Sequence, residues 1–200
     1  MFLRKFYYIY FFIILTLLTS CSTAPKELPK DLEEKTQEFT LDQIKTWIFS
    51  GRIGVKTPEK NVAANFDWTQ KNHYFNISMS GPLGAGSIKM KGTPKNATVT
   101  DSNDKVHKTN NINSEFTKIT GYTVPISNIF YWIKGQAAPG RVHKVNYSKT
   151  NKTKTIHQDG WTVKYQNFTY IKNKDLYLPE KVTISNKNVL IKIFIKNWKV

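Results

Sequence analysis

Large apolar side chains alternate with polar ones along several short segments, and this two-residue period constrains the fold more than any other feature of the chain. Such alternation predicts β-strands with one buried and one solvated face. The apolar positions are Trp47, Phe49, Ile53 and Val55; Val62, Ala64, Phe66 and Trp68; His73, Phe75, Ile77 and Met79; and Ile88 and Met90. A weaker strand carries Val106, and the pattern returns within 161–165, 182–184 and 189–195. Because the neighbouring segments are short and joined by turns, we expect an antiparallel meander.

Helical spacing is found in two other parts of the chain. Thr40 and Gln43 form a capping-box pattern near apolar residues at helical spacing, which predicts a helix over part of 31–46. Two short helices are predicted in the middle, one ending before Gly121 and one between Pro125 and Gly135. Their apolar residues are Phe116 and Ile119, then Ile126, Ile129, Phe130 and Ile133.

The order of these elements (helix, strands, two short helices, strands) indicates a mainly β fold with some α structure. Each predicted strand has one apolar face that needs cover, and too few helical residues exist for two layers. We therefore expect one long, strongly curved antiparallel sheet covered by helices. A curved sheet under a helical lid tends to enclose a cavity.

The only cysteine, Cys21, follows a secretory signal pattern. Arg4 and Lys5 precede an apolar run over 6–18, and Leu18 and Ser20 complete a bacterial lipobox before the thiol. We expect cleavage before Cys21 and acylation there, with N-acyl and S-diacylglycerol groups. An uncleaved anchor helix is the alternative, but the apolar run is shorter than the roughly 20 residues that a span needs.

This signal divides the chain into three expected parts: a cleaved signal peptide over 1–20, a lipidated N-terminus and polar tether over 21–36, and one binding domain over 37–200. Ser22 after the cysteine favours sorting to the outer membrane, where the domain would face the periplasm. With one cysteine, the chain has no intramolecular disulfide, so burial must stabilise the domain.

The charge is strongly uneven along the chain. Residues 43–200 carry 25 Lys and Arg against 8 Asp and Glu, whereas 21–42 carry six acidic residues and three lysines. A basic, aromatic-rich body is compatible with nucleic-acid binding, but the predicted export argues against it. Anionic lipid headgroups or an acidic protein partner fit better, and simple solubility is the alternative.

No pattern typical of an enzyme is found. The four histidines (His73, His107, His143 and His157) lack metal-ligand spacing to one another, and no nucleophile elbow, phosphate loop or dinucleotide fingerprint is present. His73 is expected to be a structural residue on an apolar strand face. We expect neither catalysis, nor a metal, nor a cofactor beyond the covalent lipid on Cys21.

The segment 80–86, Ser-Gly-Pro-Leu-Gly-Ala-Gly, joins two predicted strands and has one large side chain, Leu83. Glycine and proline favour a tight, solvent-facing loop there. Leu83 either folds back onto the core or forms an exposed apolar tip that contacts lipid or an acyl chain.

Taken together, these motifs resemble the LolB family of outer-membrane lipoprotein receptors over about 41–140. The matching residues are Trp47; Gly51, Arg52 and Ile53; 64–70, Ala-Asn-Phe-Asp-Trp-Thr-Gln; 80–84, Ser-Gly-Pro-Leu-Gly; Gly121; 124–126, Val-Pro-Ile; 131–135, Tyr-Trp-Ile-Lys-Gly; and Pro139 with Gly140. The resemblance implies an unclosed β-barrel with a helical lid over a hydrophobic cavity. It also implies that Leu83 is the exposed leucine that helps to deliver cargo to the membrane.

The function implied by the resemblance is transfer without covalent chemistry. The protein would receive lipoproteins from the periplasmic carrier LolA as a monomer, bind their acyl chains and insert them into the inner leaflet of the outer membrane. The candidate cavity residues, for each of which core packing is the alternative, are Trp47, Phe66, Trp68, Phe75, Ile77, Met79, Ile88, Ile129, Phe130, Trp132 and Ile133. A binder of another lipid and a structural lipoprotein without a cavity are the rival functions.

Overall fold

The computed structural model describes residues 40–82, 86–148 and 153–200. Residues 40–43 are helical, which confirms the C-terminal end of the helix expected within 31–46. The predicted signal peptide, lipidated cysteine and tether lie outside the described residues, as does Leu83.

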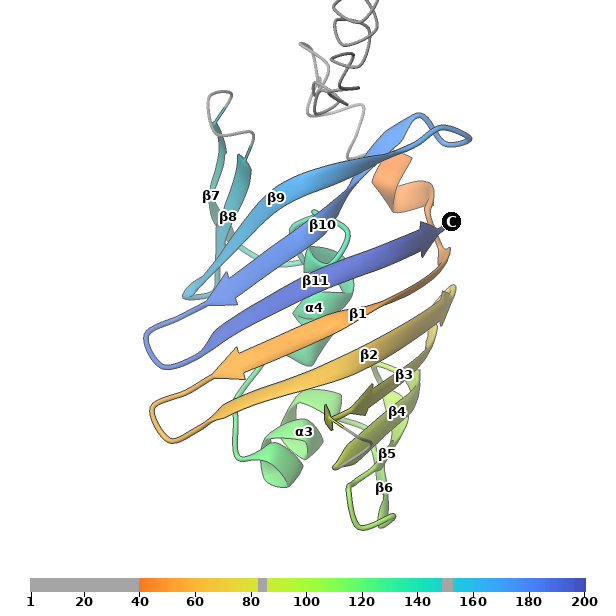
Figure 1. The fold of residues 1–200 in the computed structure, drawn as a ribbon, viewed down its shortest axis with the longest axis vertical. Coiled ribbons are helices and arrows are strands. Elements are labelled where there is room, and N and C mark those ends of the chain that lie inside the picture. The colour runs from red at the N-terminus through yellow and green to blue at the C-terminus, as the bar shows by residue number, and fades with distance from the viewer. Residues whose placement is uncertain (1–39, 83–85, 149–152) are drawn as a thin grey trace, which may run out of the picture. The chain divides into compact units, whose positions relative to one another are not determined.

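Eleven strands form a single antiparallel sheet (Figure 1). The elements in chain order are β1 (Thr46–Lys56), β2 (Asn61–Lys71), β3 (Tyr74–Ser80), β4 (Ser87–Thr93), β5 (Asn96–Thr100), β6 (Val106–Thr109), α3 (Ile112–Thr120), α4 (Ile126–Trp132), β7 (Val142–Ser148), β8 (Thr153–Gln158), β9 (Trp161–Ile171), β10 (Leu176–Ser185) and β11 (Leu190–Lys199). Their order across the sheet is β6-β5-β4-β3-β2-β1-β11-β10-β9-β8-β7. Since β6 and β7 pair on one side only, the described sheet is unclosed, and the segment between these two edge strands contains both helices.

The centre of the sheet is the pairing of β1 with both β2 and β11, which joins the two ends of the described chain. At Gly51, a side chain would collide with the carbonyl oxygen of Phe194 and approach the Phe66 ring to 2.9 Å. The absence of a side chain at Gly51 therefore leaves room for the Phe194 carbonyl group of β11 and for the Phe66 ring of β2.

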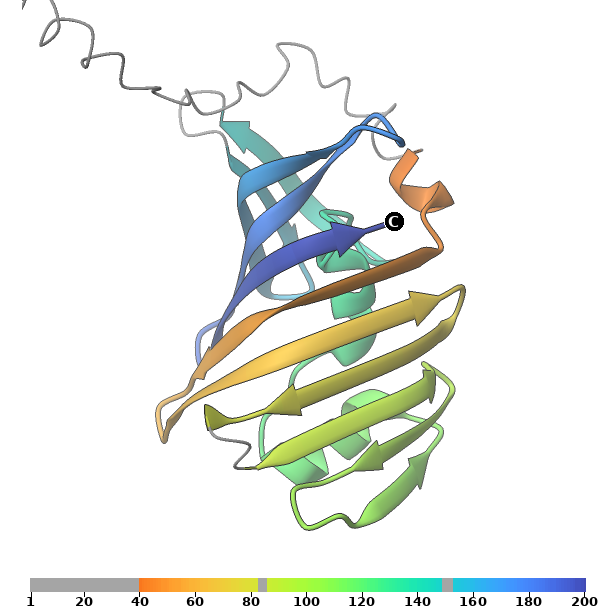
Figure 2. The same ribbon diagram turned by 45° about the vertical axis from the view of Figure 1, so that its right-hand side comes forward.

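Both helices lie on the same face of the strongly curved sheet, behind the strands in the view of Figure 2. The Asn111 side chain caps the start of α3 by accepting a hydrogen bond from the Ser114 amide. Gly121 ends α3 with φ of 78°, a left-handed conformation that glycine adopts without strain. Helix α4 begins directly after Pro125. The predicted single curved sheet and the two middle helices are therefore confirmed.

The strand pattern identified β1, β2, β3, β4, β6, β9, β10 and β11, but it missed β5, β7 and β8. In β8, Lys154 is buried beside Ile156, so the apolar alternation is broken by a lysine on the inner face. Asp159 and Gly160, both with positive φ, form the two-residue hairpin turn after β8. This Asp-Gly pair is a sequence signal that could have predicted the β8–β9 hairpin. The prediction for His73 was wrong, because this residue is exposed in the turn before β3.

Candidate functional site

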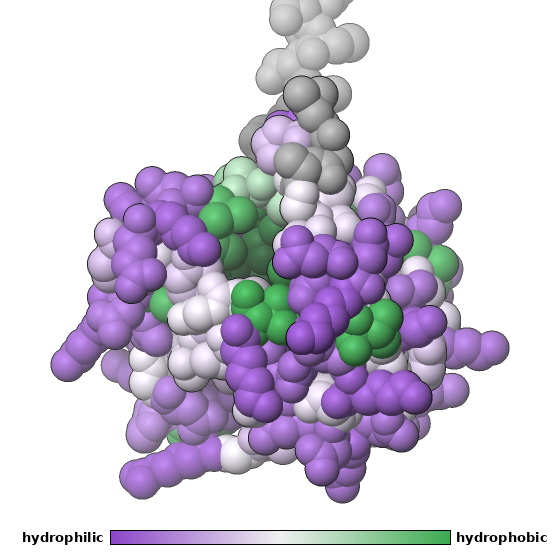
Figure 3. Space-filling view, turned by 90° about the horizontal axis from the view of Figure 1, so that it is seen from below, coloured by the Kyte–Doolittle hydropathy of each residue, from purple (hydrophilic) through white to green (hydrophobic). Residues whose placement is uncertain are grey.

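A cavity of about 490 Å³ lies between the helices and one face of β1–β4 and β11. Apolar side chains line most of it, and Figure 3 shows apolar residues around a hollow on the face seen from below. The lining residues are Ile53, Val55, Lys60, Val62, Ala63, Ala64, Phe66, Trp68, Ile77, Met79, Gly81, Pro82, Gly86, Ile88, Met90, Ser102, Phe116, Ile119, Thr120, Tyr122, Val124, Ile126, Ile129, Ile191 and Ile193. The size is typical of a small-molecule binding site.

Strand register produces the apolar wall of the sheet. Ile53 of β1 lies opposite both Ala64 of β2 and Ile193 of β11, so three apolar side chains from three strands meet on one face. Deeper along β2, Trp68 lies opposite Ile77 of β3. Since successive side chains on a strand point to opposite faces, this register places the apolar residues of each strand together.

An aromatic cluster closes the inner end of the cavity. The centroid of the Phe130 ring of α4 lies 4.9 Å from the centroid of the Phe75 ring and 5.2 Å from that of the Trp68 ring. Trp68 contacts Phe49 in turn, with the ring centroids 5.7 Å apart. Aromatic pairs at these separations add to the energy of burial, so α4 is held firmly against the sheet.

The outer end of the cavity is formed by turns. In an antiparallel meander the β1–β2, β3–β4 and β5–β6 turns lie at the same end of the sheet, and each contributes lining residues here. Gly81, Pro82 and Gly86 of the β3–β4 loop are among them, and the Gly81 amide donates a hydrogen bond to the Gly86 carbonyl oxygen over 3.4 Å. The loop that contains Leu83 therefore begins and ends at the cavity.

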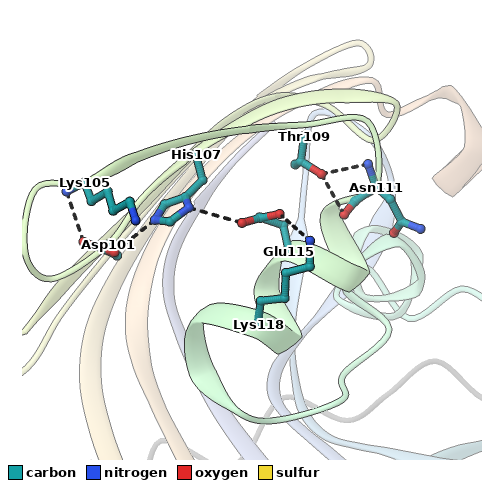
Figure 4. Close-up of polar contacts among 7 residues, drawn as sticks. All are labelled: Asp101, Lys105, His107, Thr109, Asn111, Glu115 and Lys118. Atoms are coloured by element: carbon teal, nitrogen blue, oxygen red, sulfur yellow. Dashed lines mark hydrogen bonds and ion pairs between the residues drawn. The ribbon is translucent and has the colours of Figure 1, made fainter.

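Helix α3 is attached to the edge of the sheet by a polar cluster (Figure 4). His107 of β6 places its Nε2 atom 3.0 Å from the Asp101 carboxylate and its Nδ1 atom 3.3 Å from the Glu115 carboxylate of α3. Lys118 lies 3.6 Å from Glu115. The hydrogen bond with His107 is the main cause of a lowered pKa at Asp101.

Helix α4 is attached through buried groups. Trp132 Nε1 and the Ala138 amide both donate to Gln158 Oε1 over 2.9 Å, and Gln158 Nε2 donates to the Ala138 carbonyl oxygen over 2.7 Å. After α4, Lys134 Nζ donates to the Leu41 carbonyl oxygen over 3.2 Å and lies 5.1 Å from the centroid of the Trp47 ring. Burial lowers the pKa of Lys134 to about 8.

The structure separates the candidate cavity residues into two groups. On the cavity wall lie Phe66, Trp68, Ile77, Met79, Ile88 and Ile129. In the core beside it lie Trp47, Phe75, Phe130, Trp132 and Ile133, all buried.

The other apolar lining residues are not among the candidates, although most of them share strand or helix faces with candidate residues. Ile53, Val55 and Val62 belong to the same alternating runs as the selected residues, and Phe116 and Ile119 to the predicted helix. Their shared faces were the signal that could have found them.

Over the ranges that the structure describes, no group of three His, Cys, Asp or Glu side chains could hold a metal ion. No helix in those ranges has the length and apolar character needed to cross a bilayer. The apolar cavity is the feature of this part of the chain that points to a ligand.

Comparison with known proteins identifies the family. The family model described as "Outer membrane lipoprotein LolB" matches residues 45–198, which include both helices and every strand of the sheet except the last residue of β11. The chain belongs to the LolB family. This result confirms the resemblance and extends it beyond Gly140, through the strands that complete the sheet.

Relatives in the LolB family match over nearly their whole length. The outer-membrane lipoprotein LolB of Pseudomonas syringae pv. syringae (strain B728a) is 26% identical, with 100% of this chain and 97% of the relative aligned. The LolB of Francisella tularensis subsp. tularensis (strain WY96-3418) is 27% identical over 98% of this chain and 96% of its own. LolB proteins are lipoprotein-binding transport proteins rather than enzymes, in agreement with the absence of a catalytic motif.

Solved structures share the fold at very low sequence identity. A DUF1329 family protein from Desulfovibrio piger has a TM-score of 0.54 at 6% identity, covering 82% of this chain and 89% of its own. A putative outer membrane lipoprotein-sorting protein domain from Vibrio parahaemolyticus has a TM-score of 0.51 at 5% identity, covering 83% and 89%. The unclosed, helix-covered sheet therefore recurs in proteins with little sequence in common with this one.

Proposed function

We propose that the protein receives lipoproteins from the periplasmic carrier LolA by binding their acyl chains in the cavity, and inserts them into the outer membrane. The observation that supports this most is the apolar cavity of about 490 Å³ between the sheet and the helices. Membership of the LolB family supports it independently. The six candidate residues on the cavity wall are proposed to contact the acyl chains.

The driving force would be burial of acyl chains, at roughly 25 cal/mol per Å² of apolar surface removed from water. A cavity of about 490 Å³ is in the range that takes one drug-sized ligand. An anchor with three acyl chains is larger than such a ligand, so at least one helix would move away from the sheet during transfer.

Delivery to the membrane is proposed to use the loop 81–86. Its ends line the cavity, so an apolar tip at Leu83 would be close to the acyl chains when they leave. Leu83→Glu should lower transfer of lipoproteins into membranes while leaving their uptake from LolA intact. Leu83→Ile, which keeps an apolar side chain, is the matched control, and normal delivery by Leu83→Glu would disprove the role.

The protein itself is proposed to be a monomeric lipoprotein of the outer membrane, held by acyl chains on Cys21 and facing the periplasm. The lipobox supports the anchor, and the description of the relatives as outer-membrane lipoproteins supports the location. Mass spectrometry of the mature N-terminus would test the predicted acylation directly.

The function can be tested by mixing residues 22–200, which contain every described element, with LolA that carries a radiolabelled lipoprotein. Movement of the label to this protein is expected, and LolA mixed with an unrelated basic protein is the control. Label that stays on LolA would overturn the proposal. In that case, a bound phospholipid or glycolipid found by mass spectrometry would indicate another lipid cargo, and absence of fatty-acid binding a structural role.

A further inference from the structure

Almost all of the cavity lining is apolar, and its polar side chains are gathered at one end. Apart from the Tyr122 hydroxyl, they are Lys60 in the β1–β2 turn, Ser102 in the β5–β6 turn and Thr120 at the end of α3. These elements meet at the outer end, beside the loop 81–86. The cavity therefore has a polar outer end and an apolar interior.

Lys60 is the one charged side chain in the described lining. Its Nζ atom lies 5.1 Å from the centroid of the Tyr122 ring, which also lines the cavity. No carboxylate among the described residues is within ion-pair distance of this ammonium group. An ammonium held over an aromatic ring keeps hydrogen-bond donors free for another partner.

The other polar groups at this end differ in what they can offer. The Thr120 hydroxyl already donates to the Phe116 carbonyl oxygen over 2.7 Å and accepts from the Tyr122 amide over 3.2 Å. By contrast, the Tyr122 hydroxyl is buried and has no hydrogen-bond partner in the part of the chain that the structure describes. Because this hydroxyl has almost no accessible surface, a ligand in the cavity does not reach it.

The length of the cavity wall gives the distance from this outer end to the aromatic cluster at the inner end. Along β2, Val62, Ala64, Phe66 and Trp68 line the cavity in order from the turn inward. Six residues of extended strand span about 20 Å. A long acyl chain laid along this wall would place its apolar end at Trp68 and its attachment point near Lys60.

We propose that Lys60 binds the ester carbonyl oxygens of the diacylglyceryl group on the lipoprotein cysteine and so fixes the direction in which the acyl chains enter. This inference rests on the proposed function. The linkage is uncharged but rich in carbonyl acceptors, which suits a single ammonium donor. Bound in this direction, the peptide part of the cargo leaves the cavity beside the loop 81–86, where delivery would occur.

The test uses two synthetic lipopeptides with the same peptide and chain lengths. In one, the glyceryl cysteine carries ester-linked chains; in the other, the chains are ether-linked and the carbonyl oxygens are absent. Affinity is measured for residues 22–200 and for Lys60→Met, which keeps most of the side-chain stem. We expect Lys60→Met to lose about ten-fold in affinity for the ester probe, as loss of a charge-assisted hydrogen bond would give, and to bind the ether probe unchanged.

Two further variants make the result specific to Lys60. Lys60→Arg should retain most of the preference for the ester probe, because it also donates hydrogen bonds. Lys56→Met removes a lysine from the exposed end of β1, outside the cavity lining, and should bind both probes as the unchanged chain does. Equal losses for both probes in Lys60→Met would mean that Lys60 acts only through apolar contact, and would overturn the inference.

The same assay separates this inference from the proposed function. Binding of both probes with no change in Lys60→Met would overturn the role of Lys60 and leave the proposed function standing. Failure to bind either probe would overturn both. A phosphatidylglycerol of matched chain length is the third ligand, and tighter binding of it than of the ester lipopeptide would assign the site to a phospholipid instead.

Discussion

The two helices that cover the cavity are attached to the sheet in different ways. Helix α4 buries four side chains and packs its Phe130 ring against the aromatic residues of β2 and β3. Helix α3 buries only Ile112 and contacts the sheet edge through the Asp101, His107 and Glu115 cluster. Both contribute to the cavity lining.

This difference suggests which helix moves. Local opening costs least where few apolar contacts are buried and polar contacts are accessible to water. Two hydrogen bonds between Asn113 of α3 and Ser127 of α4, 2.9 and 3.0 Å long, connect the first turns of the helices. We infer that α3 swings outward about this connection and enlarges the cavity while α4 stays in place.

The largest expected effect is on the core under α4. Phe130→Ala should lower the free energy of unfolding by about 3–5 kcal/mol, because it leaves a void among packed aromatic rings. Phe116→Ala on α3 is the matched control and should cost only about 1 kcal/mol, since this side chain is half-buried against an existing cavity. Urea unfolding of residues 22–200 measures both. Equal losses would contradict the proposed difference between the helices.

The next largest effect concerns the buried hydrogen bonds after α4. Gln158→Leu would leave the Trp132 indole nitrogen and both backbone groups of Ala138 without partners, and should cost about 3 kcal/mol. Trp132→Phe removes one donor but preserves the bonds between Gln158 and Ala138, so it should cost less. Chemical unfolding of the two variants compares them directly, and a smaller loss in Gln158→Leu would show that these bonds do not anchor α4.

Sequence periodicity predicted the faces of the elements but not the depth at which each residue lies. Phe75 and Ile77 are on the same face of β3, yet Phe75 lies under Phe130 while Ile77 lines the cavity. That distinction depends on where α4 crosses the sheet, which no local pattern contains. The two-residue period did predict the strand residues of the cavity wall, because strand register alone brings these residues together.

Long-range polar contacts were beyond the reach of local patterns for the same reason. Asp101, His107 and Glu115 belong to a turn, a strand and a helix, and only the path of the chain between β5 and α3 brings them together. Strand β8 was missed because Lys154, a lysine on its inner face, interrupts the apolar alternation. The positions of such polar residues depend on tertiary contacts between distant elements, and local propensity does not predict them.

Lys134 provides a third way to test the attachment of α4, through pH. Burial lowers its pKa to about 8 from the ordinary 10.5, so between these values the unfolded chain binds more protons than the folded one. Stability should therefore rise with pH in this window, by about 2 kcal/mol from this residue. Lys134→Met should lack this part of the rise. The measurement is the difference in unfolding free energy between the two proteins at pH 7.5 to 10.5; a constant difference would contradict the assignment.

The smallest expected effect is on α3 in acid. The pKa of Asp101 is lowered, first by its hydrogen bond with His107, so its contribution to stability is present above the ordinary value of 3.8. That contribution is lost as pH falls through the lower folded value. Amides of α3 should therefore lose protection from hydrogen exchange on acidification while amides of α4 remain protected.

Asp101→Asn tests this by removing the titrating group. After correction for intrinsic exchange rates, its α3 amides should exchange faster than those of the unchanged chain at pH 5 and respond less to further acidification. Asp104→Asn is the matched control in the same turn, because asparagine tolerates the positive φ of 58° there and Asp104 is not in the cluster. If α3 and α4 lose protection together, the helices open as one unit. The cavity would then enlarge only by breaking the aromatic core, a far costlier route for the proposed entry of acyl chains.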